Sequence, residues 1–450
     1  MNAQRIARYA FSWIAAEVST LSRYYDCMVQ WRPRVEDKGQ LLELIDSPKK
    51  VVATEFDEIK ALGHQHQAIL VLVNGNFNYD HDIQATLASL HSVLHRASRV
   101  VLVSYNSYLN WVYKAANWMG LRKDELPTTF ITRGTLNTLA RLSQFEVVRS
   151  RPTCVSPLRL KSLGNLLNRS AGVNPLSRLT SLAEVTVLRP QISSAQRPSL
   201  SIVVPTRNER GNIRAVLERI PDLGCSLEII FVEGHSKDGT WEEIQRLIPE
   251  YQHRFPILAM QQTGIGKCDA VRLGFSQASG ELLTILDADL TMPPELLGRF
   301  YDAYLSGLGD FVNGNRLTYP MEGKAMRFLN RLGNIFFAKA LSAVLEAPLG
   351  DSLCGTKLVT NSAYKRMVHW RGDFGDFDPF GDFELLFPAA TLGLGIIDIP
   401  IRYRDRTYGS TNISRFRHGF ILLKMTAVGL FRVRLSPNPV NLQATGNLPQ

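Results

Sequence analysis

Two aspartates separated by one small residue form the pattern in this chain with the most evident chemistry. Asp287-Ala288-Asp289 directly follows Leu282–Leu286, an apolar run typical of a buried strand. Hard cations such as Mg²⁺ and Mn²⁺ prefer oxygen ligands and can be shared with substrate phosphates. The pair therefore predicts a divalent cation site formed by Asp287 and Asp289. The alternative is two solvated carboxylates before a helix at Met292–Glu295, where acids suit the helix dipole.

The elements that must position this pair alternate along the chain. Leu200–Val204 and Leu227–Val232 are further apolar runs, and runs of this kind are typical of parallel strands that are buried on both faces. Gly211–Ile220 and Trp241–Leu247 have the spacing of helices. The alternation predicts a parallel α/β sheet. Because ligands bind beyond the carboxyl ends of such strands, polar residues that follow them are candidate site residues.

Four motifs follow the predicted strands in a fixed order. They are Val204–Glu209, Phe231–Thr240, Gly266–Phe275 and the aspartate pair. Together they resemble glycosyltransferase family 2, which has the GT-A fold, and within it the dolichol-phosphate and polyprenyl-phosphate mannosyl- and glucosyltransferases. The resemblance extends over residues 199–435. It implies an inverting enzyme that moves a hexose from a GDP- or UDP-sugar to a polyprenyl phosphate.

The resemblance also implies roles for residues on the donor side. The donor-binding residues are expected to be Pro205, Arg207, Glu209, Glu233, Lys267, Asp269 and Asp287. Glu233 and Gly234 stand where the family usually has two adjacent aspartates. Asp289 would hold Mg²⁺ or Mn²⁺ together with Asp287, and Thr291 stands at the place of a third ligand.

On the acceptor side the resemblance points to a basic site. The residues expected to hold an acceptor phosphate are Arg316, Arg327, Arg331, Arg404, Arg406 and Ser410. Arg327 and Arg331 share a predicted helix with an apolar face, which favours a membrane interface; the alternative is an ordinary core-packing helix. The loop that contains Arg404, Arg406 and Ser410 could close over the donor diphosphate, as active-site lids do.

Asp382 and Glu384 resemble a late acidic motif of the family that faces the acceptor. With Asp289 and Arg316 they complete the predicted catalytic set. A hydroxyl acceptor would require one of the two acids as a general base. A phosphate monoester is already anionic near neutral pH, so these acids would then orient groups or complete the metal site.

Two other functions stay open at this point. The same donor site could serve a hydroxyl on a glycan, a lipid or a protein. The chain could also be a catalytically inactive binding or assembly protein, since Glu233-Gly234 departs from the family motif. The intact pair Asp287 and Asp289 favours an enzyme.

Charge and hydropathy indicate which surfaces and substrates the protein can bind and where in the cell it is expected. The formal net charge is +10, and between Ile401 and Arg434 eight basic residues stand against one acidic residue, Asp405. A basic, partly apolar segment suits an anionic lipid surface or a phosphate-bearing substrate, and no nucleic-acid motif accompanies it. Without a signal peptide or an apolar run long enough to span a bilayer, we expect a cytoplasmic protein that is peripheral on the inner face of the cell membrane. Five scattered cysteines indicate free thiols.

The first part of the chain forms a second α/β region. Predicted strands at Ala68–Val73, Arg99–Val103 and Phe145–Val148 alternate with helices, and residues 65–190 resemble the C-terminal half of a class I S-adenosylmethionine methyltransferase. That fold holds its cofactor with a glycine-rich turn, and no such turn precedes residue 65. The stretch before residue 65 is also expected to be too short for the first two strand–helix units. We therefore predict a degenerate domain that binds no S-adenosylmethionine and serves as a scaffold or docks a partner.

The predicted fold class is α/β throughout. Residues 1–190 form the smaller, truncated Rossmann-like domain of methyltransferase type, and residues 190–198 form a linker. Residues 199–435 form the GT-A nucleotide-sugar transferase domain, a mostly parallel sheet with helices on both faces. Residues 436–450 form a loose polar tail.

Overall fold

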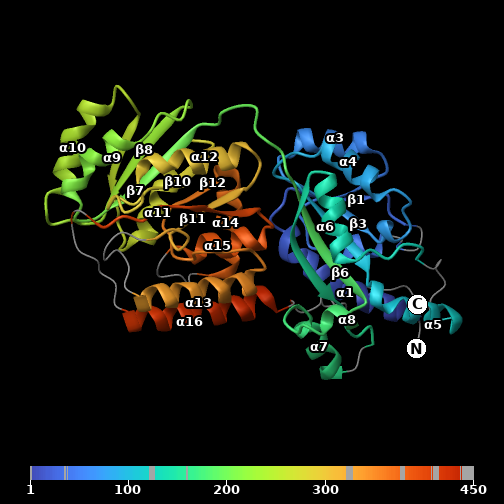
Figure 1. Cartoon of the computed structure of the whole chain (residues 1–450). Helices are drawn as coiled ribbons and strands as arrows, with labels where there is room; N and C mark the ends of the chain where they lie inside the picture. The colour runs from blue at the N-terminus through green and yellow to red at the C-terminus, as the bar shows by residue number, and fades with distance from the viewer. Residues whose placement is uncertain are drawn as a thin grey trace. The chain divides into compact units, whose positions relative to one another are not determined.

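The structure is a computed structural model, and the chain divides into two compact units (Figure 1). It describes residues 3–34, 37, 39–120, 127–158, 161–320, 328–375, 381–406, 408, 415–435 and 437. Unit 1 comprises Met1–Ile192, Thr391–Gly393 and Leu430–Gln450, and unit 2 comprises Ser193–Ala390 and Leu394–Gly429. Within these described residues each unit contains one sheet, and each unit is described by itself.

The sheet of unit 2 has seven strands in the order β13-β11-β12-β10-β7-β8-β9. Their bounds are Leu200–Thr206 (β7), Leu227–Glu233 (β8), Ile257–Gln261 (β9), Leu282–Ile285 (β10), Phe311–Asn315 (β11), Lys357–Thr360 (β12) and Ile396–Pro400 (β13). β12 is antiparallel to both β10 and β11, and the other neighbours are parallel. The six strands other than β12 therefore end at the same edge of the sheet, as the predicted mostly parallel sheet requires.

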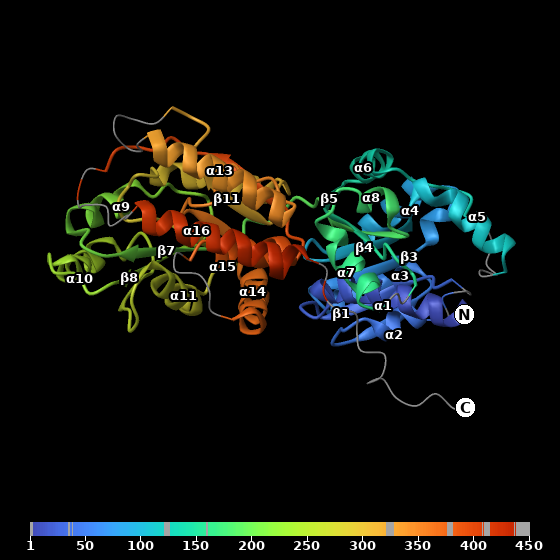
Figure 2. The ribbon, with the colours of Figure 1, turned by 90° about the horizontal axis from the view of Figure 1, so that it is seen from below.

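Helices cover both faces of this sheet. On one face α9 (Ile213–Arg219), α10 (Thr240–Tyr251) and α12 (Leu297–Leu305) share an apolar core with β7 and β8. On the other face α11 (Lys267–Gln277) packs against β7 and β8. The remaining helices are α13 (Phe328–Leu345), α14 (Asn361–Phe374), α15 (Phe383–Thr391) and α16 (Arg415–Gly429). α13 and α16 lie side by side (Figure 2).

The sheet of unit 1 has six strands in the order β2-β1-β3-β4-β6-β5. Their bounds are Cys27–Trp31 (β1), Lys50–Ala53 (β2), Ile69–Asn74 (β3), Arg99–Tyr105 (β4), Phe145–Thr153 (β5) and Ala183–Pro190 (β6). β1 to β4 are parallel, and β6 is antiparallel to both of its neighbours. The helices are α1 (Ala3–Ser22), α2 (Gln40–Leu44), α3 (Phe56–Gln65), α4 (Ile83–Val93), α5 (Asn110–Trp118), α6 (Arg133–Leu142), α7 (Lys161–Arg169) and α8 (Ser177–Thr180).

The N-terminal helix α1 belongs to the core of unit 1. Trp13 is buried, and the buried carboxylate of Glu17 pairs with Arg149 and Arg151 at 3.7 and 3.2 Å. Its apolar residues are therefore explained by packing. Among the described residues of the whole chain, no helix combines the length and the hydropathy that crossing a bilayer would need.

The prediction that the stretch before residue 65 is too short for two strand–helix units is wrong. β1 followed by α2 and β2 followed by α3 both lie within the first 65 residues. β1 was missed because it is only five residues long and has a buried glutamine, Gln30, among its apolar side chains. A single polar residue in so short a run removes the hydropathy signal by which a buried strand is recognised.

Gly274 sets the distance between α11 and the sheet of unit 2. A Cβ atom placed there would lie 3.0 Å from one methyl carbon of Val203, even closer to the other, and 3.2 Å from Val232. The absence of a side chain lets the helix approach β7 and β8, which is necessary because Lys267 at its first turn belongs to the site described below.

Gly274→Ala is expected to lower the free energy of unfolding by about 1–3 kcal/mol, because the added methyl group overpacks this contact. Gly372→Ala in α14 is the matched control: an added Cβ meets nothing within 4 Å, so the better helix propensity of alanine should raise stability by up to about 1 kcal/mol. Chemical denaturation of both variants measures the difference. Equal effects would show that α11 can move away from the sheet without cost.

Candidate active site

The predicted site residues of unit 2 gather at the edge where its parallel strands end. The chain leaves β7 through α9 to β8, which lies on one side of β7 in the sheet, whereas β10 lies on the other side. A topological switch point therefore falls between β7 and β10. Open α/β sheets bind ligands at such points. The aspartate pair follows β10, and the motif Val204–Glu209 follows β7. The edge between them is therefore the candidate active site.

Asp287 forms an ion pair with Lys267, the first residue of α11. Burial alone would lower the pKa of Lys267, but the charge of Asp287 outweighs it, and the pKa lies above its ordinary value. Burial would likewise raise the pKa of Asp287, and the charge of Lys267 holds it below its ordinary value. Both groups are therefore charged at neutral pH. Gly355 faces the pair so closely that a Cβ atom there would collide with both side chains.

Asp289 is held by a different cation and by its own turn. One carboxylate oxygen accepts from the Thr291 hydroxyl at 2.8 Å and from the Thr291 backbone N–H at 3.1 Å. The other oxygen pairs with Arg406 at 2.6 Å. Thr291, which stands where a third metal ligand was expected, thus orients Asp289 through hydrogen bonds.

Glu209 shares Arg406 with Asp289. Its carboxylate lies 3.3 Å from the Arg406 guanidinium and accepts from the Asn212 amide at 2.7 Å. Burial raises the pKa of Glu209 to about 7, helped by the charge of Asp289, while Asn212 and Arg406 oppose the rise. Glu209 therefore titrates in the neutral range.

The segment after β13 brings Arg406 to this place. The Arg404 backbone N–H donates to the Thr291 carbonyl at 2.9 Å, which fixes the segment beside the aspartate turn. Further on, the Tyr408 hydroxyl donates to Asp238 at 3.2 Å, and the Tyr408 ring lies directly against Gly211. The segment thus crosses from the β10 loop to the loop after β7. The side chain of Arg404 is exposed.

The other predicted donor residues surround the same edge. Pro205 is half-buried at the end of β7, and Arg207 after it is exposed. Glu233 is buried at the end of β8 and accepts from the Ser236 backbone N–H at 2.5 Å. Asp269 accepts from the Gly264 backbone N–H at 3.0 Å and so holds the loop that precedes α11.

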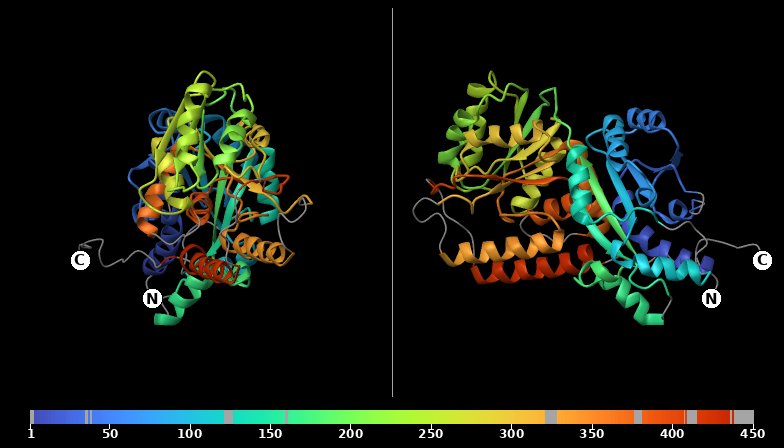
Figure 3. Two further views of the ribbon diagram at one scale, coloured as in Figure 1. Left: turned by 90° about the vertical axis from the view of Figure 1, so that its left-hand side faces the viewer. Right: turned by 45° about the vertical axis from the view of Figure 1, so that its right-hand side comes forward.

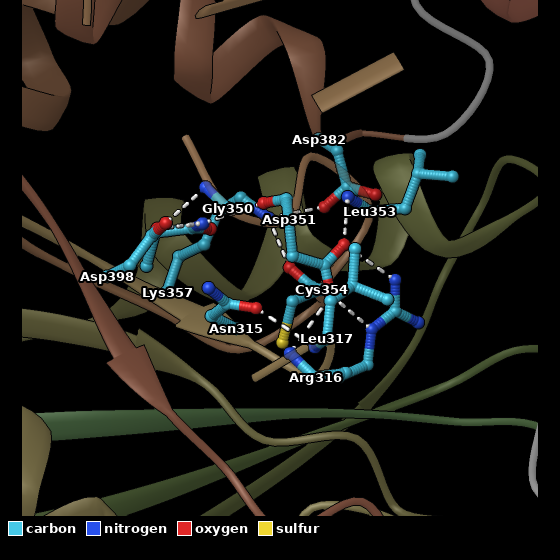
Figure 4. Close-up of polar contacts among 11 residues, drawn as sticks. Asn315, Arg316, Leu317, Gly350, Asp351, Leu353, Cys354, Lys357, Asp382 and Asp398 are labelled. Carbon is cyan, nitrogen blue, oxygen red and sulfur yellow. Dashed lines mark hydrogen bonds and ion pairs between the residues drawn. The ribbon is translucent and has the colours of Figure 1, made fainter. Parts of the chain in front are cut away.

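Arg316 follows β11 and is committed to a partner within the chain (Figure 4). Its guanidinium donates to both carboxylate oxygens of Asp351 at 2.6 and 2.8 Å and lies over the ring of Tyr403. Despite the opposing effect of burial, Arg316 holds the pKa of Asp351 below its ordinary value. The geometry indicates a positioning role for Arg316, which fixes the loop before β12.

The buried Lys357 and the half-buried Asp382 form a second pair in the same cluster (Figure 4). Lys357 opens β12 and also donates to the Cys354 carbonyl. Nearby, Asp398 accepts from the Asn313 amide at 2.7 Å, and burial raises its pKa to about 6. Asp351 and Lys357 carried no sequence signal, because a single charged residue in a loop or at a strand end is usually solvated.

Glu384 lies in α15 and is saturated with donors. Arg272 donates to its two oxygens at 2.6 to 3.2 Å, and Arg371 pairs with it at 3.3 Å. The Cys268 thiol also donates to it at 2.9 Å. The carboxylate is buried and serves two guanidinium groups, which is the arrangement of a structural anion.

The last predicted acceptor residues do not join the cluster. Arg331 is exposed on α13, and Arg327 and Ser410 lie outside the described residues. The structure therefore brings together the donor-side residues and Asp382, and it adds four partners that the sequence did not reveal. These are Asp351, Lys357, Arg272 and Arg371.

Comparison with known proteins identifies the family. The model of glycosyl transferase family 2 matches residues 201–371, all within unit 2. A dolichyl-phosphate hexose transferase from Haloferax volcanii is 31% identical over 227 residues, which cover 49% of this chain and 89% of that protein. A dolichol-phosphate mannosyltransferase from Mycosarcoma maydis is 33% identical over 262 residues, which cover 55% and 84%. The chain belongs to glycosyltransferase family 2. The resemblance seen in the motifs is confirmed, and the protein is a glycosyltransferase.

Other relatives match a smaller part of their own length. A dolichol-phosphate mannosyltransferase from Pyrococcus furiosus is 36% identical over 128 residues, which cover 28% of this family 2 chain and 34% of that protein. Among solved structures, a mannosyltransferase from Pyrobaculum calidifontis in complex with GDP-Man and Mn²⁺ is 19% identical with a TM-score of 0.34; the match covers 52% of this chain and 63% of that one.

The raised pKa of Glu209 predicts a pH-dependent stability. Since the pKa is about 7 when folded against an ordinary value of 4.5, the folded state holds the proton more tightly. Stability should therefore fall as pH rises from about 4.5 to about 7 and then level off. Glu209→Gln cannot ionise and still accepts from Asn212, so from pH 5 to pH 8 it should gain about 2 kcal/mol relative to the wild type.

Unfolding midpoints measured with a chelator present at several pH values give this difference. The exposed Glu242 provides the control, because Glu242→Gln should show no such trend. A constant offset between Glu209→Gln and the wild type from pH 5 to pH 8 would contradict the assignment.

Proposed function

We propose that unit 2 is an inverting, metal-dependent hexosyltransferase that uses a GDP- or UDP-sugar and a polyprenyl phosphate acceptor of dolichyl type. The observation that carries the proposal is the paired charge at the sheet edge, where Asp287 meets Lys267 and Asp289 meets Arg406. The names of the Haloferax and Mycosarcoma relatives, which are transferases of dolichyl phosphate, support the acceptor class.

The two aspartates suit a divalent cation that is shared with a substrate. Among the described residues, no group of three or more His, Cys, Asp or Glu side chains is arranged to hold a metal ion. A site with one or two carboxylates plus substrate phosphates is typical of Mg²⁺. Asp287 and Asp289 would hold Mg²⁺ or Mn²⁺ together with the donor diphosphate, and the cation would neutralise the leaving diphosphate as the sugar departs.

Lys267 and Arg406 are placed to serve the same charge. Each now neutralises one aspartate, and each would face the diphosphate once a cation satisfied the aspartates. Arg406 comes from the segment that crosses toward the loop after β7, so it is suited to cover the diphosphate and to exclude water. Glu209 and Glu233 line the donor side as hydrogen-bond acceptors.

The surroundings of Glu384 favour a phosphate acceptor over a hydroxyl acceptor. A general base must reach the proton it removes. Glu384 is buried between Arg272 and Arg371, and Asp382 is paired with Lys357. A phosphate oxygen is already anionic near neutral pH and attacks without a base. The exposed Arg404, whose backbone N–H donates to Thr291 beside the aspartate turn, is suited to hold that phosphate, since Arg316 is engaged by Asp351.

The face formed by α13 and α16 suits the site of a lipid-borne acceptor. Leu332 and Phe336 of α13 and Phe420 and Leu423 of α16 are exposed, and exposed lysines accompany them on both helices. Figure 3 shows the two helices side by side along their lengths. An apolar, cationic helix pair of this kind binds in the headgroup region of an anionic membrane. We propose peripheral binding at the cytoplasmic face of the membrane.

The decisive experiment combines a panel of GDP- and UDP-sugars with Mn²⁺ or Mg²⁺ and a short polyprenyl phosphate, and identifies products by mass spectrometry. One donor should give a glycolipid, and a chelator should abolish it. Asp289→Asn should lower kcat/KM by about 10²-fold or more, because it removes charge from the site. The exposed Asp302 provides the control, since Asp302→Asn should retain full activity.

Two outcomes would contradict the proposal. Full activity of Asp289→Asn would exclude the metal site, and equal transfer to the free polyprenol would exclude the phosphate as the attacking group.

Glu384→Gln separates a structural anion from a catalytic base. It leaves Arg272 and Arg371 without their shared charge, so the free energy of unfolding should fall by about 3 kcal/mol. At a temperature where the variant stays folded, kcat should change by less than about tenfold, whereas loss of a general base would cost about 10²- to 10⁴-fold. Denaturation and steady-state kinetics measure both, with Glu281→Gln, an exposed acid, as the control. A large loss of kcat at unchanged stability would favour the hydroxyl acceptor.

A further inference from the structure

Helix α7 of unit 1 has its apolar side chains on the outside. Leu163, Leu166 and Leu167 are all exposed, at the spacing of one helix face. Asn168 faces inward, where its side chain is fully buried and hydrogen-bonded to the backbone N–H and carbonyl of Ser156 at 2.8 and 3.0 Å. Its fixed contacts orient the helix, so the leucine stripe is directed away from the core of unit 1.

Helix α5 repeats this pattern with aromatic side chains. Trp111 and Trp118 are 69% and 88% exposed, and the exposed Lys114 lies between them one turn from each. Tyr113 on the other side of the helix is buried and donates its hydroxyl to the Leu182 carbonyl. Two tryptophans on an outward stripe are unusual on a soluble surface, because large apolar side chains gain free energy when they leave water.

The two stripes are connected through α8. The Asn106 amide, just before α5, donates to the carbonyls of Arg178 and Ser181 at 3.0 and 2.8 Å. α8 and the residues leading into it add the exposed Leu176 and Leu179. We call this surface the α5–α8 face, defined by Trp111, Trp118, Leu163, Leu166, Leu176 and Leu179. α5, α7 and α8 lie along one side of unit 1 (Figure 1).

The charge of these segments has one sign. Residues 105–120 and 154–182 contain no acidic residue at all, and they contain Lys114, Arg159, Lys161, Arg169 and Arg178. Among the described residues of these two segments, the exposed charged side chains are Lys114, Arg169 and Arg178. A face that combines exposed leucines and tryptophans with such cations is complementary to an anionic bilayer, where the apolar side chains enter the headgroup region and the cations meet lipid phosphates. Tryptophan in particular is enriched at that depth.

We propose that unit 1 binds the surface of an anionic membrane through the α5–α8 face. This assignment gives unit 1 a function of its own, and it does not depend on the proposed chemistry of unit 2. A protein partner is the competing occupant, but a protein interface would need acceptors for these cations, and it would not require that the exposed charged side chains described on these two segments all be positive.

The test measures partition of the full-length protein onto vesicles by co-sedimentation. Vesicles of phosphatidylcholine with about one third phosphatidylglycerol should bind the protein, and added salt should weaken the binding. Trp111→Ser with Trp118→Ser, and Leu163→Ser with Leu166→Ser, should each lower the partition constant about tenfold or more. Leu142→Ser, an equally exposed leucine on α6 outside the face, should leave it unchanged.

The double variant Phe336→Ser with Phe420→Ser measures separately how much the face of α13 and α16 in unit 2 contributes to vesicle binding. Since vesicle binding requires no sugar transfer, its result is independent of the donor and acceptor assays. Quenching of tryptophan fluorescence by brominated lipid should be lost largely in the Trp111, Trp118 variant. Unchanged partition and unchanged quenching in that variant, with an unchanged unfolding midpoint, would overturn the proposal and leave a protein partner as the occupant.

Discussion

Two carboxylates one residue apart at a sheet edge are tolerable only when positive charge lies close to both. Asp287 and Asp289 are half-buried, and two like charges that are partly removed from water repel each other more strongly than they would in bulk water. Lys267 forms an ion pair with Asp287, and Arg406 forms one with Asp289. This requirement constrains unit 2, because Lys267 at the start of α11 must lie beside the loop that follows β10, and the chain after β13 must return to the same edge.

The same alternation of charge continues behind the edge. Arg316 with Asp351, Lys357 with Asp382, and two arginines with Glu384 form pairs that are mostly buried. Such pairs contribute little net stability, because desolvation offsets their attraction, but breaking one of them is costly. The main effect of these pairs is therefore to fix the positions of the segments that they connect. Asp382 and Glu384, which are held in these pairs, are poorly placed for proton transfer, whereas Asp287 and Asp289 lie at the sheet edge where a cation could replace their partners.

Sequence patterns predicted the parts of the fold that depend on local periodicity. The apolar runs that became β7, β8 and β10 place Glu209, Glu233 and Asp287 at one edge, because parallel strands of a sheet end together. The partners of these acids were harder to find. Lys357 and Asp351 meet Asp382 and Arg316 only through the antiparallel insertion of β12, and no local pattern encodes which distant residues face each other. Arg316 was predicted to bind an acceptor phosphate. The residues next to it in the sequence do not indicate that Asp351 is its partner.

At the corresponding edge of the sheet in unit 1, buried polar side chains form hydrogen bonds with one another. β2 and β3 lie on either side of β1, so the switch point falls between β1 and β3. There the buried Asp37 accepts from Gln30 of β1 at 2.5 Å and from Asn74 of β3 at 3.0 Å, and so joins the two strand ends with side chains of the protein itself. A cofactor at that point would have to break the buried hydrogen bonds of Asp37. In unit 2, by contrast, a metal ion with a diphosphate would replace the ion pairs of Asp287 and Asp289 with other charged contacts. The two units share an architecture, and the difference between their edges is why we expect ligand chemistry in unit 2 and surface binding in unit 1.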